Sequence, residues 1–64
     1  MIHEGDKVKL ITGEIALIDE VLEPNVAYIA GIFKKGGGVS VDQISYQDIY
    51  SVFEEVERPL AHAV

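Results

Sequence analysis

Apolar and polar residues alternate along most of the chain, and this period of two is typical of half-buried β-strands. Residues 7–10 alternate strictly, whereas residues 14–22 alternate with one change of parity near residues 17–19. A change of parity within a long strand predicts a bulge or a sharp bend. The pattern predicts five strands, at residues 7–10, 14–22, 26–33, 39–42 and 50–56.

Turn-forming residues separate these segments. Thr12-Gly13 ends the first strand, and Pro24-Asn25 suits the central positions of a tight turn, because proline fixes φ and asparagine tolerates an unusual φ. The sequence KKGGG at residues 34–38 supplies glycines for the positive φ values of a hairpin loop. The short polar segment Ser45–Asp48 predicts one helical turn before the last strand.

Two of these segments allow a second interpretation. A glycine loop that binds phosphate leads into the N-terminus of a helix, but here the glycines lead into the strand-like residues 39–41. A hairpin tip is therefore favoured, with weak phosphate contact by its lysines as a secondary role. Residues 44–57 have partly helical spacing, so a helix of ten residues is an alternative there, although their β-branched and aromatic residues favour strand.

Five short strands with one helical turn before the last predict a small all-β barrel. We expect residues 1–58 to form this barrel and residues 59–64 to form a flexible C-terminal tail, because Pro59 interrupts strand pairing. The residues expected in the barrel interior are Val8, Leu10, Ile18, Val41, Ile44 and Val52.

Two stretches resemble known families. Residues 5–10, with Thr12-Gly13-Glu14 and residues 15–18, resemble a KOW-type strand–loop–strand, with Ala16 where that motif places its central glycine. Residues 41–52 resemble the fourth strand, helical turn and fifth strand of SH3-like barrels. The whole pattern is similar to small SH3-like proteins carried by mobile elements and phages of Gram-positive bacteria. The resemblance implies a five-stranded SH3-like barrel, and its KOW-like part implies nucleic-acid binding.

Length and composition limit the number of domains, the possible chemistry and the expected location of the protein. A chain of 64 residues makes one small domain, and the absence of cysteine excludes disulfides and thiolate chemistry. No apolar run approaches the roughly 18–20 residues of a membrane span. Residues 1–10 contain no basic segment followed by an apolar one, as a secretory signal does. We therefore expect a cytoplasmic protein without membrane contact.

The charge balance is acidic, with 5 basic and 11 acidic residues and a formal net charge of −6. Such a chain repels nucleic acid unless its cations gather on one face. Lys7, Lys9, Lys34 and Lys35 are the candidates for that face, and they carry the alternative function of a KOW-like nucleic-acid-binding accessory protein. A third idea is that the acidity mimics nucleic acid and occupies a DNA-binding protein.

The sequence offers no convincing catalytic constellation. Its histidines, His3 and His62, lie near the two termini, and its serines have no neighbouring histidine to act as a base. A metal site of both histidines with Glu4 would need the chain ends to meet, and terminal residues are usually mobile. We therefore expect a protein that is not an enzyme, with no catalytic, cofactor-binding or metal site and no small-molecule substrate.

The most informative feature is a surplus of apolar surface. Residues 26–33 and 50–53 are apolar on both parities, yet a small barrel has only one interior. Ile29, Phe33, Tyr50 and Phe53 are therefore predicted to form an outward patch that binds a protein partner or a second copy of the chain. The alternative is that Leu60-Ala61 covers this patch. The leading function is a non-enzymatic protein-interaction or self-associating module.

Overall fold

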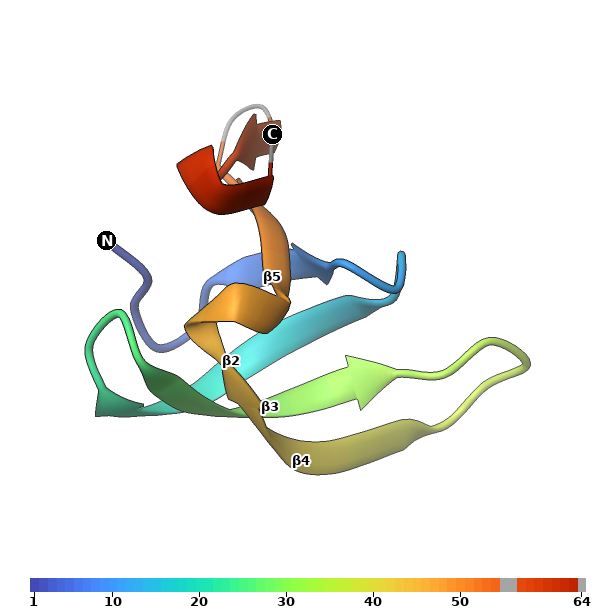
Figure 1. The fold of residues 1–64 in the computed structure, drawn as a ribbon. Helices are drawn as coiled ribbons and strands as arrows, with labels where there is room; N and C mark the ends of the chain where they lie inside the picture. The colour runs from blue at the N-terminus through green and yellow to red at the C-terminus, as the bar shows by residue number, and fades with distance from the viewer. Residues whose placement is uncertain (55–56, 64) are drawn as a thin grey trace.

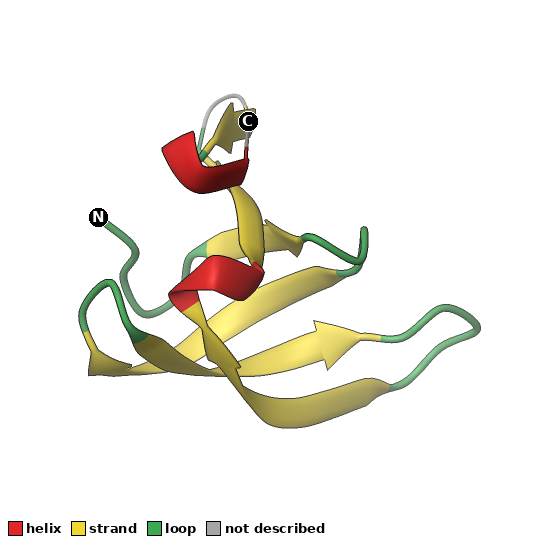
Figure 2. Ribbon diagram, viewed as in Figure 1, coloured by secondary structure: helices red, strands yellow, loops and turns green. Residues whose placement is uncertain are grey.

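The chain folds into a single all-β sheet with short 3₁₀ turns (Figures 1 and 2). The computed structural model describes residues 1–54 and 57–63. Within these residues, six antiparallel strands pair in the order β4-β3-β2-β1-β5-β6. The strands are β1 (Lys7–Leu10), β2 (Ile15–Glu23), β3 (Ala27–Phe33), β4 (Val39–Ser45), β5 (Ile49–Phe53) and β6 (Glu57–Pro59), and the 3₁₀ turns are η1 (Tyr46–Asp48) and η2 (Ala61–Ala63).

The predicted all-β class is confirmed, and the number of strands is larger than predicted. β4 and β6 form the two edges of the sheet and are not paired with each other in the described part of the chain, so the sheet is not closed there. The predicted helical turn is confirmed as η1, and the alternative ten-residue helix is wrong because β5 follows η1 directly. The predicted fifth strand extended to residue 56, but residues 55–56 lie outside the described residues.

The predicted bulge in the second strand is confirmed. The register of β2 against β3 shifts between Ile18 and Glu20, and it shifts again between Val21 and Glu23. Each shift inserts a residue without a direct partner and bends the strand. The bends let β2, the longest strand, pair with β1 at one end and follow β3 along its whole length.

The two predicted turns around β3 are also confirmed. Asn25 has a positive φ of 63°, and the Val26 N–H donates to the Glu23 carbonyl at 3.0 Å, which closes the turn between β2 and β3. In the KKGGG segment the Lys34 N–H donates to the Gly38 carbonyl at 3.0 Å. All three glycines have positive φ, so KKGGG is the tip of the β3–β4 hairpin.

One face of the sheet, together with Ile2, encloses the core. Its buried hydrophobic residues are Ile2, Val8, Leu10, Ala16, Ile18, Tyr28, Ala30, Ile32, Ile44, Ile49 and Val52. The predicted interior position of Val41 is wrong, since its side chain is 64 % exposed. Val41 lies directly opposite Gly31, on the face of the sheet that points away from the core. Ile44 has the opposite parity in β4 and faces the core, opposite Tyr28. The remaining predicted interior residues are buried.

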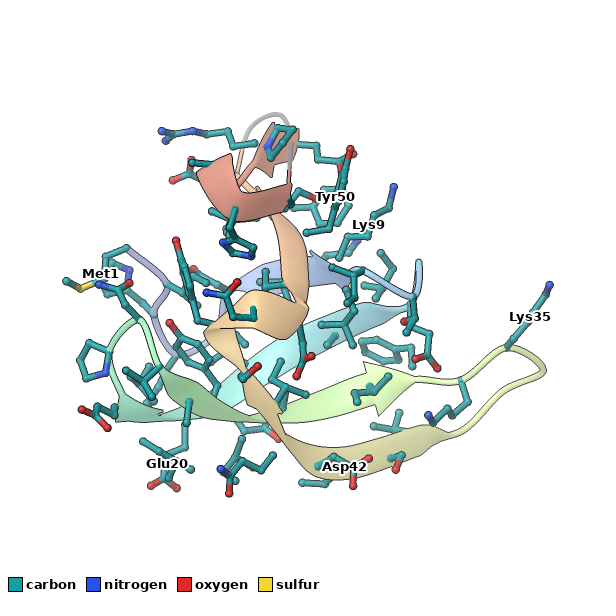
Figure 3. The ribbon with its side chains drawn as sticks, viewed as in Figure 1. Met1, Lys9, Glu20, Lys35, Asp42 and Tyr50 are labelled. Atoms are coloured by element: carbon teal, nitrogen blue, oxygen red, sulfur yellow. The ribbon has the colours of Figure 1, made fainter. Side chains whose placement is uncertain are left out.

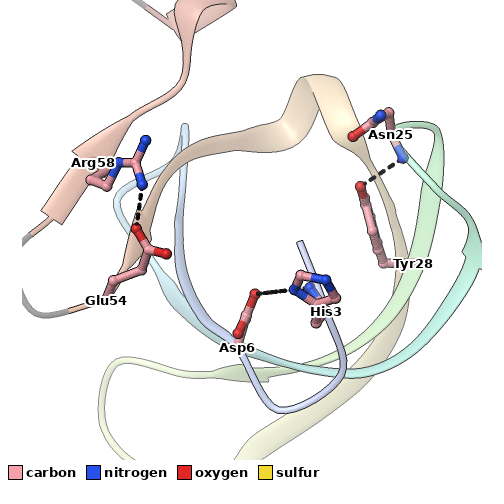
Figure 4. A network of polar contacts seen from close by, with 6 residues as sticks. All are labelled: His3, Asp6, Asn25, Tyr28, Glu54 and Arg58. Atoms are coloured by element: carbon pink, nitrogen blue, oxygen red, sulfur yellow. Dashed lines mark hydrogen bonds and ion pairs between the residues drawn. The ribbon is translucent and has the colours of Figure 1, made fainter. Parts of the chain in front are cut away.

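Tyr28 anchors the β2–β3 turn to this core. Its ring is fully buried, and its hydroxyl oxygen accepts a hydrogen bond from the Asn25 N–H at 3.0 Å (Figure 4). Burial raises the pKa of the Tyr28 phenol above its ordinary value, because the ionised form would lose its hydration. The tyrosine is thus held neutral in the core while its polar end satisfies a turn amide.

The C-terminal residues fold back onto β5. Ser51 is fully buried, and its hydroxyl donates to the Glu57 carboxylate at 2.5 Å across the β5–β6 pair. Further along, Nε2 of His62 lies 2.8 Å from the Ile49 carbonyl oxygen, and the His62 ring centroid lies 4.8 Å from that of Tyr46. The predicted boundary between barrel and tail, at residues 58 and 59, therefore falls inside β6. No described helix has the length and apolar character needed to cross a membrane.

Candidate interaction surface

The face of the sheet that points away from the core carries a group of apolar side chains on three neighbouring strands. In one row across the sheet, Ile15 of β2 lies opposite Phe33 of β3, which lies opposite Val39 of β4. In the next row Leu17 lies opposite Gly31, and Gly31 lies opposite Val41. Because directly opposed residues project to the same face, these side chains are neighbours. We call the group the outer apolar patch: Ile15, Leu17, Phe33, Val39 and Val41.

The outer apolar patch is open to solvent and continuous. The exposed fractions are 57 % for Val39, 48 % for Phe33 and 39 % for Leu17. Gly31 lies at the centre of the patch, and a Cβ atom placed there would be 3.2 Å from Cγ1 of Val39. The Val39 side chain therefore lies over Gly31 and fills the space that a larger residue would occupy. Contiguous exposed apolar surface of this kind is typical of an interaction site.

The four residues predicted to bind a partner lie in two groups rather than one. Phe33 belongs to the outer apolar patch, and the half-buried Ile29 lies on the same face one row further along β3. Tyr50 and Phe53 lie on β5, and β1 separates β5 from β2 in the sheet. Nζ of Lys7 lies 5.3 Å from the Phe53 ring centroid, so a cation lies beside the ring on this part of the sheet.

Four members of the patch are not among the residues predicted from the sequence, namely Ile15, Leu17, Val39 and Val41. Leu17 is in the middle of a strand whose two faces both contain apolar residues, so its exposure depends on which face meets the core. Val39 and Val41 alternate with Ser40 and Asp42, and that alternation was visible. Because β4 is an edge strand, Ser40 and Asp42 can lie on the core side of the sheet and still reach solvent at its margin. Val39 and Val41 then lie on the outer face.

The four lysines predicted as a nucleic-acid site do not form one compact cationic surface. Nζ of Lys9 lies 3.7 Å from a Glu57 carboxylate oxygen, and Nζ of Lys34 lies 3.2 Å from a Glu14 oxygen. The hydrogen bonds from Lys34 and from the Thr12 hydroxyl lower the pKa of Glu14 below its ordinary value.

The arrangement of the two lysine pairs follows from the strand order. Lys7 and Lys9 belong to β1. Figure 3 shows Lys9 projecting from that strand and Lys35 extending from the tip of the β3–β4 hairpin. Strand β2 lies between β1 and that hairpin. The two pairs are therefore separated, and each pair contains one lysine that is beside a carboxylate.

Charges of both signs border the outer apolar patch, since Lys7 and Lys9 of β1 lie opposite Leu17 and Ile15. An Oδ2 atom of Asp19 would lie 3.8 Å from a Cβ atom on Gly31, and Glu20 lies opposite Ile29 in the adjacent row. On the opposite face of β4, the Asp42 carboxylate accepts a hydrogen bond from the Ser40 hydroxyl at 2.9 Å. No ion pair among the described residues includes any of these three carboxylates.

Of two hollows in the described part of the molecule, one lies away from the outer apolar patch, and the other is partly lined by its residues Ile15 and Phe33. One, of about 270 Å³, is lined by residues that include Ile2, Tyr46, Glu54 and Arg58, and the last two form an ion pair with an N···O distance of 2.7 Å (Figure 4). The other, of about 400 Å³, lies between the β1–β2 turn and the base of the β3–β4 hairpin. In the second lining the Thr12 hydroxyl donates to a Glu14 carboxylate oxygen at 3.0 Å, but the lowered pKa of Glu14 makes this carboxylate a weak base.

The two histidines lie in separate places. Nδ1 of His3 lies 3.9 Å from Oδ2 of Asp6, whereas His62 lies against Ile49 and Tyr46. In the part of the chain that the structure describes, no three histidine, cysteine or acidic residues are grouped as metal ligands.

No protein-family model, no curated protein and no solved structure matches the chain in comparisons with known proteins.

Proposed function

We propose that this chain is a non-enzymatic protein-interaction module and that the outer apolar patch is its binding surface. The observation that carries the proposal is the exposure of Leu17, Phe33, Val39 and Val41 on three adjacent strands. Burial of apolar surface contributes about 25 cal/mol per Å², so a partner that covers a few hundred Å² gains several kcal/mol before the costs of association. The function is therefore recognition by surface contact.

We further propose that the module is a variant of the SH3-like barrel. Three features support this assignment: the strand order β4-β3-β2-β1-β5, the 3₁₀ turn directly before β5, and the bends in β2. The additional strand β6 extends the sheet beyond β5. The resemblance concerns architecture, and the binding partner is argued from the surface alone.

The second candidate function is nucleic-acid binding through Lys7, Lys9, Lys34 and Lys35. Two observations support it. Lys35 extends from the hairpin tip, and no ion pair among the described residues includes Lys7. Against it stand the net charge of −6 and the carboxylates beside Lys9 and Lys34. A phosphate backbone would approach these cations against the field of the whole protein.

The test compares two single variants that change the net charge by the same amount. Val41→Lys places a charge in the outer apolar patch, and Gln47→Lys places the same charge at an exposed position in η1. The wild type and the two variants are immobilised, and partners are captured on each from an extract of the native cell. A captured protein is then purified, and its affinity for the wild type and for each variant is measured by calorimetry. We expect binding to the wild type and to Gln47→Lys, with at least tenfold weaker binding to Val41→Lys because a desolvated charge opposes burial.

Equal affinity of the purified partner for both variants would remove the outer apolar patch from the function. Single-stranded and duplex RNA and DNA are titrated in parallel at two salt concentrations. Affinity for any of them that falls steeply with salt, and that falls again when the four lysines are replaced by alanine, would favour the second candidate.

A further inference from the structure

The backbone of β4 presents unpaired hydrogen-bonding groups along the edge of the sheet. At one end of the β3–β4 ladder the Lys34 N–H donates to the Gly38 carbonyl, and at the other end the Tyr46 N–H donates to the Val26 carbonyl. Between these ends the register has no shift. In an antiparallel pair the hydrogen-bonded positions alternate, so the even-numbered residues of β4 are the ones bonded to β3.

The odd-numbered residues of β4 therefore direct their N–H and C=O groups outward. They include Val39, Val41 and Gln43, whereas the amide of Ser45 donates to the Asp48 carboxylate at 2.9 Å. Proteins usually protect such an edge with proline, a bulge or a very short strand. The other edge, β6, has three residues and ends at Pro59, but β4 has seven residues, no proline and no bulge.

The side chains of β4 indicate the chemistry of a strand that would fit there. On one face Val39 and Val41 continue the outer apolar patch, and on the other face Asp42 is exposed. A strand added beside β4 would place alternate residues on these two faces. Apolar residues would then extend the patch, and a lysine or arginine on the opposite parity would lie beside Asp42.

A second copy of this chain does not have that chemistry along its own free edge. Antiparallel pairing of two complete β4 strands places residue 39 opposite residue 45, and Asp42 then lies opposite its counterpart in the other copy. Like charges directly opposite each other are destabilising, and each copy also carries a net charge of −6. The same carboxylate favours a cationic strand.

We infer that β4 accepts an extended cationic segment of another protein as an additional strand of the sheet, with apolar residues over Val39 and Val41 and a basic residue beside Asp42. This inference rests on the proposed function and names the kind of partner and the way it binds. Backbone hydrogen bonds to Val39, Val41 and Gln43 hold the segment, and the alternating side chains select it.

The probe is an acetylated and amidated peptide in which valine and lysine alternate, titrated into the ¹⁵N-labelled full chain and followed by NMR. Controls are a peptide of alternating valine and glutamate and a peptide with the valine–lysine composition in shuffled order. We expect saturable shifts at the amides of Val39, Val41 and Gln43, and slower hydrogen exchange of these amides with the probe only. The two controls should produce neither change.

Two variants separate the backbone contribution from the charge contribution. Gln43→Pro removes an outward N–H without removing a bond to β3, so it should weaken probe binding at least threefold relative to Gln43→Ala. Asp42→Asn should weaken probe binding about twofold to fivefold, which is the contribution of an exposed ion pair. The control is Glu54→Gln, which changes the net charge by the same amount but lies next to β5, away from β4 in the sheet.

The outcomes distinguish this inference from the proposed function. Probe shifts confined to residues other than those of β4, or unchanged affinity in both Gln43→Pro and Asp42→Asn, would overturn strand addition. If a purified natural partner nevertheless loses affinity for Val41→Lys but not for Gln43→Pro, the outer apolar patch binds it as a face and only the strand addition is wrong. If Val41→Lys has no effect on that partner, the proposed function itself fails.

Discussion

At the scale of single residues, Tyr28 combines two demands that usually conflict. A fully buried ring contributes apolar contact, while a buried hydroxyl needs a hydrogen-bond partner. The Asn25 N–H supplies that partner at 3.0 Å, and the residue that supplies it has the positive φ that closes the turn. A side chain of the core thereby binds the backbone of a surface turn, at an asparagine that tolerates the positive φ.

Replacement of this hydroxyl gives a prediction with a defined pH dependence. Tyr28→Phe leaves the Asn25 N–H without its acceptor, and we expect it to lower the free energy of unfolding by about 1 kcal/mol near neutral pH. The raised pKa of folded Tyr28 means that above pH 10 the unfolded state loses the phenol proton before the folded state does. The stability of the wild type therefore falls as the pH rises above 10, and this contribution is missing in Tyr28→Phe.

Urea unfolding of both proteins at pH 7 and at about pH 10.5 measures this difference. We expect the stability gap between wild type and Tyr28→Phe to narrow at the higher pH. Tyr46 and Tyr50 are present in both proteins, so their titration does not affect the comparison. A gap that stays constant or widens would contradict the link between burial and ionisation at Tyr28.

The hairpin tip provides a second prediction at this scale. Gly37 has a φ of 104°, and no described atom lies within 4 Å of a Cβ placed there, so a side chain at this position would be strained by the backbone and not by contacts. We expect Gly37→Val to lower the free energy of unfolding by about 1–2 kcal/mol. Lys35→Val adds the same side chain at a loop position without positive φ and should change stability by less than about 0.5 kcal/mol. Equal losses in the two variants, measured by urea unfolding, would show that the conformation of Gly37 is unimportant.

At the scale of elements, β4 combines two contrasts: its two edges differ in hydrogen bonding, and its two faces differ in polarity. One edge is bonded to β3 and the other is open, and one face is apolar while the other carries Ser40 and Asp42. The polar face tolerates its position on the core side because β4 is at the margin of the sheet, where water still reaches Asp42. A central strand with the same sequence would bury an unpaired carboxylate.

Hydrogen exchange should report this alternation directly. We expect the amides of Ser40, Asp42 and Ile44 to exchange slowly, because each donates to β3, and the amides of Val39, Val41 and Gln43 to exchange rapidly in the free protein. Residue-resolved exchange by NMR measures the pattern. Uniform protection along β4 would mean that its outer edge is already paired, for example in a stable dimer, whereas uniform exposure would mean that the β3–β4 ladder is not formed.

The elements show where sequence reasoning succeeds and where it ends. Alternation and turn residues predict strands β1 to β5, the bend near Ile18 and the helical turn, because these features depend on neighbouring residues. Alternation says which residues share a face but not which face is inside, and for this reason it wrongly predicts Val41 in the interior. The pairing of β6 with β5 is accompanied by the hydrogen bond between Ser51 and Glu57, and neither feature has a periodic signal in the sequence.

The candidate site was predictable to a similar extent. Apolar residues on both parities of β3 indicate outward apolar surface, and Phe33 is exposed there, while its role in binding stays a prediction. The grouping of Phe33 with Phe53 required β3 and β5 to be close on one face, but the strand order inserts β2 and β1, with Lys7 and Lys9, between them. Strand order is a property of the whole chain, and the alternation pattern does not contain it.

At the scale of the whole molecule, charge is distributed unevenly over the sheet. Lys9 and Arg58 lie beside carboxylates on the β1–β5–β6 side, while Asp19, Glu20 and Asp42 have no ion-pair partner among the described residues on the β2–β3–β4 side. The outer apolar patch is on this second side. Asp19 and Glu20 lie on the face of this patch and Asp42 lies on the opposite face of β4, while Lys7 and Lys9 lie at the β1 margin of the patch.

This arrangement predicts how the protein associates with itself through the face of the outer apolar patch. A few hundred Å² buried on each copy gains several kcal/mol at about 25 cal/mol per Å², which only slightly exceeds the lower estimates for lost translational and rotational freedom. Two copies with a net charge of −6 repel each other, and salt shortens the range of that repulsion. We expect a monomer at low salt and weak, concentration-dependent dimers at about 0.5 M salt, where the Debye length is only a few Å.

Sedimentation equilibrium over a series of salt and protein concentrations measures this association. Val41→Lys should reduce the dimer at high salt, because it inserts a charge into the buried face, whereas Gln47→Lys should leave the dimer intact or favour it slightly through the lower net charge. Nucleic-acid binding has the opposite salt dependence, so the same series separates the two surfaces. A dimer that dissociates as salt is added would show that ion pairs, and not the outer apolar patch, hold two copies together.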